Sequence, residues 1–145
     1  RRSEGGMFGN LADINTTVTP FEAGLGFFIN MDKGDFIGRD ALIKKDKRTC
    51  MFGITCKSET PVSGSKVLDG DEVVGYVTAG VPSPTLKLGI GFVKFYKPND
   101  WLGRELTLKL PNGSNHQANI VQLPFFDHKK NIVKGIDRTI PSIPE

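Results

Sequence analysis

The chain has 145 residues and a mass of 15.9 kDa, enough for one ordinary domain or for one domain with a fragment of its neighbour. Its 38% hydrophobic and 24% charged residues are typical of globular proteins and exclude disordered and membrane compositions. A formal net charge of +3 is too small and too scattered for a nucleic-acid footprint, and no apolar run approaches the roughly 18 residues of a membrane span. We therefore expect neither nucleic acid nor membrane as a partner.

The N-terminal region, residues 1–18, is rich in Gly, Asn and Thr, which predicts a loop. Three carboxylates lie in or near it, Glu4, Asp13 and Glu22. In a concave site such carboxylates can accept hydrogen bonds from the N–H donors of a ring. Turn capping and solvation are the plainer interpretation of the same residues, and the pattern alone leaves both open.

The next region predicts a strand followed by a short helix. Residues 25–31 are aromatic and β-branched, which favours a buried strand ending at the turn 32–34. Asp35 stands where an N-cap belongs, so a helix is expected over about 36–45. Its apolar stripe would contain Phe36, Ile37, Ala41 and Leu42. The charged run 44–48 is interpreted as a solvated surface at a domain boundary, with a docking patch as the alternative.

The rest of the chain alternates short strands with turns. Strong turn signals lie at 69–71 and 111–114, because Asp, Asn and Gly tolerate the backbone of tight turns. Strands are predicted near 50–57, 66–68, 73–78, 88–95, 105–110 and 117–122. Their number and spacing predict a mainly β fold, an antiparallel barrel or sandwich. The tail beyond Leu123 has enough apolar side chains to lie along another domain or partner, namely Phe125, Phe126, Ile132, Ile136, Ile140 and Ile143.

The cysteines and histidines do not predict a disulfide or a metal site. Cys50 and Cys56 lie in one predicted strand, which separates their Cα atoms by roughly 20 Å, far beyond the roughly 7 Å that a disulfide tolerates. We expect both to be reduced and half-buried. His116 and His128 lack the spacing of a zinc site and are interpreted as surface residues, so no metal is expected.

Two Gly-x-Gly segments, at 24–26 and 89–91, superficially suggest nucleotide-binding loops. Neither has a third glycine at the required offset, and neither stands between a strand and a helix. A β-bulge or close packing against neighbouring backbone is the better explanation of glycines in such strand patterns.

Several motifs, taken in order, resemble the glycine cleavage T-protein family of aminomethyltransferases. The end of that family's folate-binding region is similar to four segments here, RSEGG at 2–6, DI at 13–14, TPFEAGLG at 19–26 and DFIGRDAL at 35–42. The run VVGYVTAGVPSPTLKLGIGFVKF at 73–95 resembles the family's C-terminal barrel. LPFFDHKK, from Leu123, is similar to the way in which many relatives finish.

The resemblance implies a six-stranded antiparallel Greek-key barrel over residues 49–128. A short strand-helix remnant of an α+β folate-binding domain would precede it, over 1–48, and an extended tail would follow, over 129–145. The chain would be the C-terminal fragment of a tetrahydrofolate-dependent aminomethyltransferase, inactive alone because the family's catalytic aspartate lies upstream. The alternatives are the folate-binding end of a sarcosine or dimethylglycine dehydrogenase, with a flavin domain upstream, and a non-catalytic barrel that binds a partner protein.

The resemblance also implies where the site lies and what it meets. Arg2, Glu4 and Asp13 would lie at or near the central folate cavity, whereas Glu22 would be structural. The chain departs from the family's pattern at Asn10 and Leu11, where relatives usually carry an aromatic residue and Gly. The implied partners are folate, a small methylated or aminomethyl donor, a lipoyl carrier protein and an upstream domain of the same polypeptide. The implied location is the cytoplasm, or the mitochondrial matrix in a eukaryote.

Overall fold

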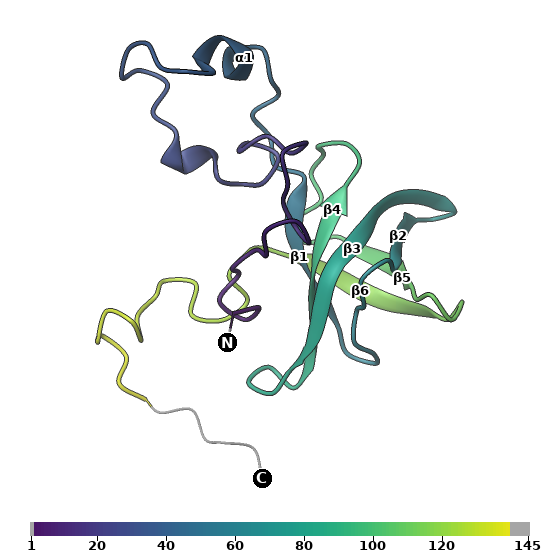
Figure 1. Cartoon of the computed structure of the whole chain (residues 1–145). Coiled ribbons are helices and arrows are strands. Elements are labelled where there is room, and N and C mark those ends of the chain that lie inside the picture. The colour runs from purple at the N-terminus through teal and green to yellow at the C-terminus, as the bar shows by residue number, and fades with distance from the viewer. Residues whose placement is uncertain (1, 140–145) are drawn as a thin grey trace.

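The computed structural model describes residues 2–139, and its main body is a closed antiparallel barrel (Figure 1). Its strands are β1 (Met51–Cys56), β2 (Lys66–Asp69), β3 (Glu72–Ser83), β4 (Leu88–Phe95), β5 (Glu105–Lys109) and β6 (Asn115–Val121). The predicted mainly β fold and its six strands are confirmed. Only β3 differs much in length, since it continues to Ser83 instead of ending near residue 78.

The strand order around the barrel is β1-β4-β3-β2-β5-β6, and β6 pairs with β1 to close it. Strands β2, β3 and β4 are consecutive neighbours, while β1 lies beside β4 and β5 beside β2. A strand that returns beside the first of three consecutive strands defines a Greek key, so the predicted topology is confirmed. Closure leaves no unpaired edge in this sheet.

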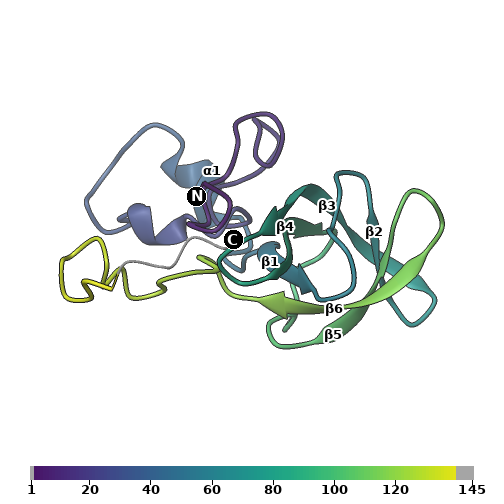
Figure 2. The ribbon, with the colours of Figure 1, turned by 90° about the horizontal axis from the view of Figure 1, so that it is seen from below.

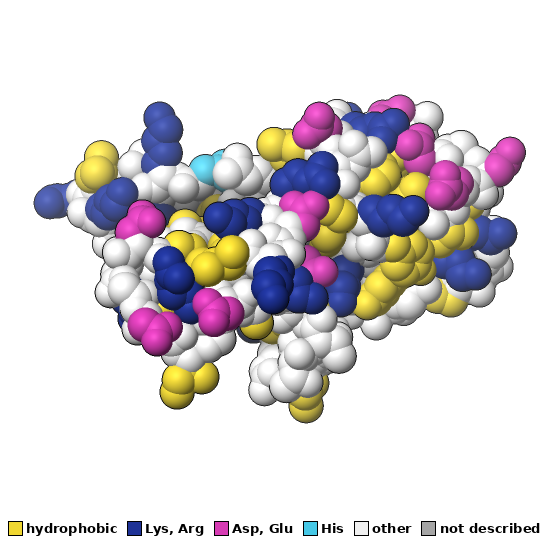
Figure 3. All heavy atoms as spheres, turned by 90° about the horizontal axis from the view of Figure 1, so that it is seen from above, with side chains coloured by type: hydrophobic (Ala, Val, Ile, Leu, Met, Phe, Trp, Pro, Cys, Tyr) yellow, Lys and Arg dark blue, Asp and Glu magenta, His cyan; other side chains and the backbone are white. Residues whose placement is uncertain are grey.

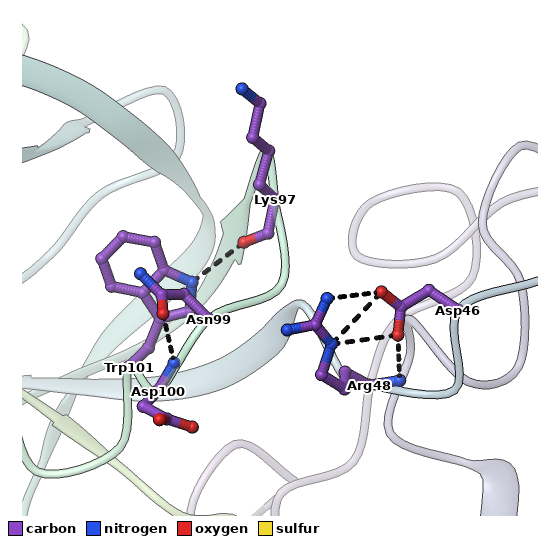
Figure 4. A network of polar contacts seen from close by, with 6 residues as sticks. All are labelled: Asp46, Arg48, Lys97, Asn99, Asp100 and Trp101. Atoms are coloured by element: carbon purple, nitrogen blue, oxygen red, sulfur yellow. Dashed lines mark hydrogen bonds and ion pairs between the residues drawn. The ribbon is translucent and has the colours of Figure 1, made fainter.

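The inside of the barrel is a continuous apolar core, because alternate side chains of each strand point inward. Its members are Ile54, Cys56, Val67, Val77, Val93, Phe95, Trp101, Leu106, Leu108, Leu110, Ala118 and Ile120. The Trp101 ring stacks on Phe95, with centroids 4.3 Å apart and planes 8° from parallel. Its indole nitrogen donates to the carbonyl oxygen of Lys97 at 3.0 Å, which satisfies the polar atom of a buried ring (Figure 4).

A second apolar cluster covers part of the outer face of the barrel. Its buried members are Met51, Ile90, Phe92 and Phe125, with Phe8, Ala79, Leu86, Leu88, Val121 and Leu123 packed against them. The Phe92 ring lies between Phe8 and Phe125, at centroid distances of 5.0 Å and 5.9 Å. The start of the chain and the segment after β6 thus meet on this face, and both lie on the same side of the barrel (Figure 2).

The tail was expected to lie along another domain or partner. Its first part instead packs on this chain's own barrel, because Phe125 belongs to the outer cluster. Farther along, Ile136 is exposed. The apolar residues Ile140 and Ile143 lie outside the described residues.

Three glycines of β3 and β4 lie at close range to neighbouring backbone, and for two of them, Gly80 and Gly89, that backbone belongs to residues 59–61. A Cβ atom added at Gly80 would lie 1.9 Å from the Pro61 carbonyl oxygen, and one at Gly89 would lie 2.2 Å from the Glu59 carbonyl oxygen. One at Gly91 would meet the Ala79 carbonyl oxygen at 2.8 Å. Such distances are impossible for real atoms, so these positions are restricted to glycine. The expectation that the 89–91 segment serves close backbone packing is confirmed.

The predicted strand at 25–31 is wrong. This segment contains a short 3₁₀ helix, η1 (Gly26–Phe28), with no buried residue. A strand needs a neighbour to pair its backbone groups, and no named strand pairs with this segment. The apolar pattern is present, but the described chain offers nothing for it to pack against.

The predicted helix at 36–45 exists only in part, as α1 (Arg39–Ile43). Its N-cap position is held by Gly38, with a φ of 89°, and not by Asp35. None of its residues is buried, and Ile37, expected in the buried stripe, is fully exposed. The stripe fails because nothing among the described residues covers this side of the helix.

A capping box fixes the segment between the N-terminal loop and the barrel. The Thr19 backbone N–H donates to Glu22 Oε2 at 2.8 Å, and the Glu22 N–H donates to Thr19 Oγ1 at 3.2 Å. The Glu22 carbonyl oxygen in turn accepts the N–H groups of Cys50 and Met51, at 2.9 Å and 3.1 Å. The backbone hydrogen bond from Thr19 lowers the pKa of the Glu22 carboxyl and outweighs the effect of burial. Glu22 therefore has the structural role that was expected.

Both cysteines are free, as expected, and both are buried more deeply than expected. Cys56 belongs to the inner core, and Cys50 precedes β1. Burial raises the pKa of the Cys50 thiol, which disfavours the reactive thiolate.

The charged run 44–48 is exposed along its whole length. Within it, Arg48 Nη2 donates to Asp46 Oδ2 at 2.7 Å, and Arg48 Nε contacts both carboxylate oxygens (Figure 4). These hydrogen bonds lower the pKa of Asp46 to about 2. An ion pair this exposed contributes little to stability.

Among residues 2–139, no helix is long and apolar enough to cross a membrane.

The glycine contact predicts a large effect of one added methyl group. We expect Gly80→Ala to lower the free energy of unfolding by about 3 kcal/mol or more, because the methyl group must displace the Pro61 backbone. Urea denaturation followed by circular dichroism measures this change. Gly113→Asn is the matched control, because open space surrounds Gly113 and Asn tolerates its positive φ. Equal stability of the two variants would contradict the contact.

The capping box predicts a pH-dependent loss of stability. We expect Glu22→Ala to cost about 1 kcal/mol at neutral pH, because the Thr19 N–H loses its acceptor. The pKa of Glu22 is lower in the folded chain than its ordinary 4.5, so its contribution is present above that value and is lost as the pH falls below it. The stabilities of wild type and variant, measured by urea denaturation, should therefore converge in acid. A difference that persists unchanged at pH 2 would contradict this explanation.

Candidate functional site

The three predicted site residues all lie in the N-terminal loop, where it packs on the barrel. Asp13 is the most deeply placed, and its side chain is 0% exposed. Thr78 Oγ1, from β3, donates a hydrogen bond to Asp13 Oδ1. The Gly9 backbone N–H donates to Asp13 Oδ2 at 2.6 Å. Both oxygens of this buried carboxylate thus have partners, one from the barrel and one from the loop itself.

Arg2 lies beside Asp13 and is only partly buried. Its Nη1 atom is 3.8 Å from Asp13 Oδ2, and it donates a hydrogen bond to the Met7 carbonyl oxygen at 3.0 Å. The side chain remains 49% exposed. A guanidinium has five N–H donors in a fixed plane, so one held in this way still presents donors to an anionic group.

Glu4 is half-buried and reaches the turn between β3 and β4. Ser83 Oγ donates to Glu4 Oε1 at 2.5 Å, and the Thr85 N–H approaches the same oxygen at 3.3 Å. Burial acts to raise the pKa of this carboxyl, but the hydrogen bonds from Ser83 and Thr85 outweigh it and lower the pKa below its ordinary value. Glu4 is therefore held ionised, as a hydrogen-bond acceptor.

The backbone of Glu4 has a separate role. Its carbonyl oxygen accepts the N–H groups of Phe125 and Phe126, at 3.0 Å and 3.1 Å. The start of the chain, the β3–β4 turn and the segment after β6 thus meet at one residue. Arg2 and Asp13 contact each other directly, and Glu4 is joined to them through the same loop and through β3.

The departure from the family pattern lies in this loop and is local. Leu11 has a φ of 66° and is exposed, and Asn10 forms an isolated bridge with Ile14. The chain forms a tight turn here, with an exposed leucine at a positive φ. Phe8, two residues before Asn10, packs on Phe92.

Two further residues of this region were not identified as site residues from the sequence. Thr78 and Ser83 are both buried and both donate to carboxylates of the N-terminal loop. They lie in the run 73–95, whose resemblance to the family barrel was recognised. The motif could therefore be identified from the sequence, but the roles of these two side chains could not.

Three open hollows mark the described surface. One of about 390 Å³ lies between residues 57–60 and the β3–β4 turn. One of about 270 Å³ lies beside the Asp13 loop and is lined by residues 10–25, and one of about 480 Å³ lies between Phe21, Phe27 and Thr49. Each is widely open to solvent, so none of the three is a closed cavity.

Metal-ligating side chains and histidines are the other candidates for chemistry in the described part of the chain. No group of three or more His, Cys, Asp and Glu side chains among residues 2–139 is arranged to hold a metal ion. His116 Nδ1 lies 3.0 Å from Ser58 Oγ, and its Nε2 lies 2.9 Å from Ser114 Oγ. His116 is thus half-buried and bonded on both ring nitrogens, unlike the surface residue that was expected.

Comparison with known proteins agrees with this architecture. Residues 47–127 match the family model of the glycine cleavage T-protein C-terminal barrel domain. The aminomethyltransferase of Caldanaerobacter subterraneus subsp. tengcongensis is 37% identical over 132 residues, which are 88% of this chain and 34% of that protein. The aminomethyltransferase of Streptomyces coelicolor is 36% identical over 139 residues, 89% of this chain and 37% of that protein.

A solved structure shows the same fold. The glycine cleavage system aminomethyltransferase T from Bartonella henselae superposes with a TM-score of 0.76 at 24% identity, over 87% of this chain and 37% of that one. The chain thus spans about a third of the length of the curated relatives that it matches. Since the family model covers more than half of the chain, including all six strands, the chain belongs to the glycine cleavage T-protein family and contains its C-terminal barrel domain.

Proposed function

We propose that this chain is the C-terminal part of a tetrahydrofolate-dependent aminomethyltransferase, and that its N-terminal loop forms one wall of the folate site. The similarity to curated aminomethyltransferases over nearly nine-tenths of the chain favours this function over the dehydrogenase alternative. The cytoplasm, or the mitochondrial matrix in a eukaryote, is the compartment that we expect for such a protein.

The observation that carries the proposal is an uncovered apolar surface beside the barrel. Phe27 is 78% exposed and Phe28 is 76% exposed, and their rings lie against each other with centroids 4.1 Å apart. Ile37 and Ile43 are also exposed on this part of the chain. In Figure 3, hydrophobic side chains lie among Lys and Arg residues both on this part of the chain and over the barrel. Large apolar side chains exposed to this degree mark an interface, and an upstream domain of the same polypeptide is the partner that we propose.

The N-terminal loop offers groups that fit a reduced folate. Glu4 is ionised and can accept the N–H donors of a pterin ring, and Arg2 can pair with a carboxylate. Asp13 completes the set by holding Arg2. When bound, tetrahydrofolate accepts a one-carbon unit from the aminomethyl donor, for which a lipoyl carrier protein is the source that we propose.

This chain would contribute orientation and exclusion of water, not proton transfer. The predicted residues are two carboxylates and a guanidinium, and each carboxylate is already engaged as an acceptor by a hydroxyl group of the barrel, which suits a positioning role. Walls that exclude solvent protect a formaldehyde-level intermediate from hydrolysis. The catalytic aspartate would come from the part of the relatives' length that this chain does not span.

Binding of tetrahydrofolate tests the proposed function directly. We expect a full-length protein carrying this chain to give a saturable heat on calorimetric titration with tetrahydrofolate, and to transfer a one-carbon unit to it. The 145-residue chain alone should bind weakly or not at all, because these hollows are widely open to solvent. No heat at millimolar ligand with the full-length protein would refute the proposal, and tight binding by the chain alone would place the site elsewhere.

The uncovered surface predicts the behaviour of the chain alone. We expect it to bind the dye ANS and to self-associate, because burying each phenylalanine is worth about 2 kcal/mol. The double variant Phe27→Ser/Phe28→Ser should reduce both effects with little change in barrel stability. Val133→Ser, at an exposed tail position, is the control and should change neither. Unchanged dye fluorescence in the double variant would show that the dye binds to apolar surface elsewhere on the chain.

A further inference from the structure

We infer that Thr78 and Ser83 of β3 are positioning residues of the folate site, whose hydroxyl groups fix the carboxylates of Asp13 and Glu4. The inference rests on the proposed function. It assigns to the barrel the positioning of two carboxylates, in addition to the enclosure of the site. It also gives a role to the two buried hydroxyl residues of β3.

The two hydroxyl groups are unusual in their burial and in their reach. The buried polar residues of the described chain are Asp13, Ser65, Thr78 and Ser83. Ser65 bonds locally, donating to the Val62 carbonyl oxygen at 2.7 Å. Thr78 and Ser83 instead donate to carboxylates 65 and 79 positions away in the sequence. They are the buried hydroxyl groups that join the barrel to the N-terminal loop.

A β-bulge places both hydroxyl groups on the same face of β3. Side chains five residues apart in a regular strand point to opposite faces. The pairing with β4 shifts between Val77 and Ala79, so that Thr78 is the extra, unpaired residue. Val77 belongs to the inner core, whereas Ala79 packs with the outer cluster. From Ala79 the alternation carries Ser83 outward as well, beside Thr78 and beneath the loop.

The direction of the Ser83 hydrogen bond is fixed by its neighbours. The Leu86 N–H donates to Ser83 Oγ at 3.1 Å, so the hydroxyl already acts as an acceptor. Its own proton is then available for Glu4 Oε1, at 2.5 Å. A carboxylate that accepts this hydrogen bond is held ionised and in one orientation.

Thr78 acts on Asp13 in the same way. With Oδ1 occupied by Thr78, Asp13 Oδ2 is left for the Gly9 N–H and for Arg2. Removing the hydroxyl would leave Asp13 Oδ1 without its donor from the barrel, so that the Gly9 N–H alone would orient the carboxylate beside Arg2. Groups held in place before binding lose little rotational entropy when the ligand arrives, so this arrangement favours affinity.

The test compares buried hydroxyl groups in the full-length protein. We expect Ser83→Ala to weaken binding of tetrahydrofolate about tenfold in calorimetry, the effect of losing one hydrogen bond to a charged group. The same variant should raise the pKa of the Glu4 carboxyl, measured by carbon-13 NMR. Thr78→Val should also weaken binding, and Thr78→Ser, which keeps the hydroxyl group, should restore it. Ser65→Ala, which removes a buried hydroxyl that contacts neither carboxylate, should leave both binding and the Glu4 pKa unchanged.

Each outcome decides one claim. If Ser83→Ala binds like the wild type, or weakens binding no more than Ser65→Ala does, the positioning role is refuted while the proposed function stands. If the wild type binds no tetrahydrofolate, the proposed function fails, and the Glu4 pKa in Ser83→Ala still decides whether this hydroxyl fixes the carboxylate. Thermal melting of every variant separates these results from loss of folding, and Thr78→Ser covers the case in which Thr78→Val does not fold.

Discussion

A carboxylate that is removed from water must have hydrogen-bond donors, and the attachment of the N-terminal loop follows from this constraint on Asp13. The loop supplies one donor from Gly9, but the second comes from Thr78 of the barrel. The loop can therefore bury Asp13 only where a barrel hydroxyl meets it. Once it is seated there, Phe8 packs on Phe92 and Glu4 reaches Ser83. Polar contacts of the loop with β3 and the β3–β4 turn thus set the register in which its apolar side chains pack.

The barrel that supplies this contact is itself shaped by close backbone approach. Residues 59–61 cross β3 and β4 where glycines replace side chains, next to the bulge that turns Thr78 outward. A bulge or a glycine inside a strand lowers the stability of the sheet. Both are tolerated where packing by the surrounding residues compensates for this loss. Here the inner apolar cluster packs on one face of β3 and the outer apolar cluster packs on the other. The same strand can therefore complete the core and present hydroxyl groups to a loop.

How far the sequence predicted this structure depends on whether the responsible contacts lie within the chain. The six strands were predicted because alternation and turn residues are local signals, and the partner strands are present. The strand at 25–31 and the stripe of α1 failed because their apolar residues pack against nothing described here. The roles of Thr78 and Ser83 could not be predicted, since a bulge shifts the alternation by one residue without a sequence signal of its own. Asp13, Glu4 and Arg2 were selected by resemblance, and only the structure shows which donors hold them.

The failed elements and the successful ones support the same physical interpretation of the chain. The sequence pattern predicts that Phe27 and Phe28 are buried, whereas the structure leaves both exposed. The two conflict only if the chain is considered alone. With a covering surface, the same side chains would be buried, and each would stabilise the contact by about 2 kcal/mol. The N-terminal loop has the same character, because Arg2 is half-exposed and the hollow beside it is open. Both features lie on the side of the barrel where the loop meets the tail (Figure 2), so one covering domain would close the site and bury the apolar surface together.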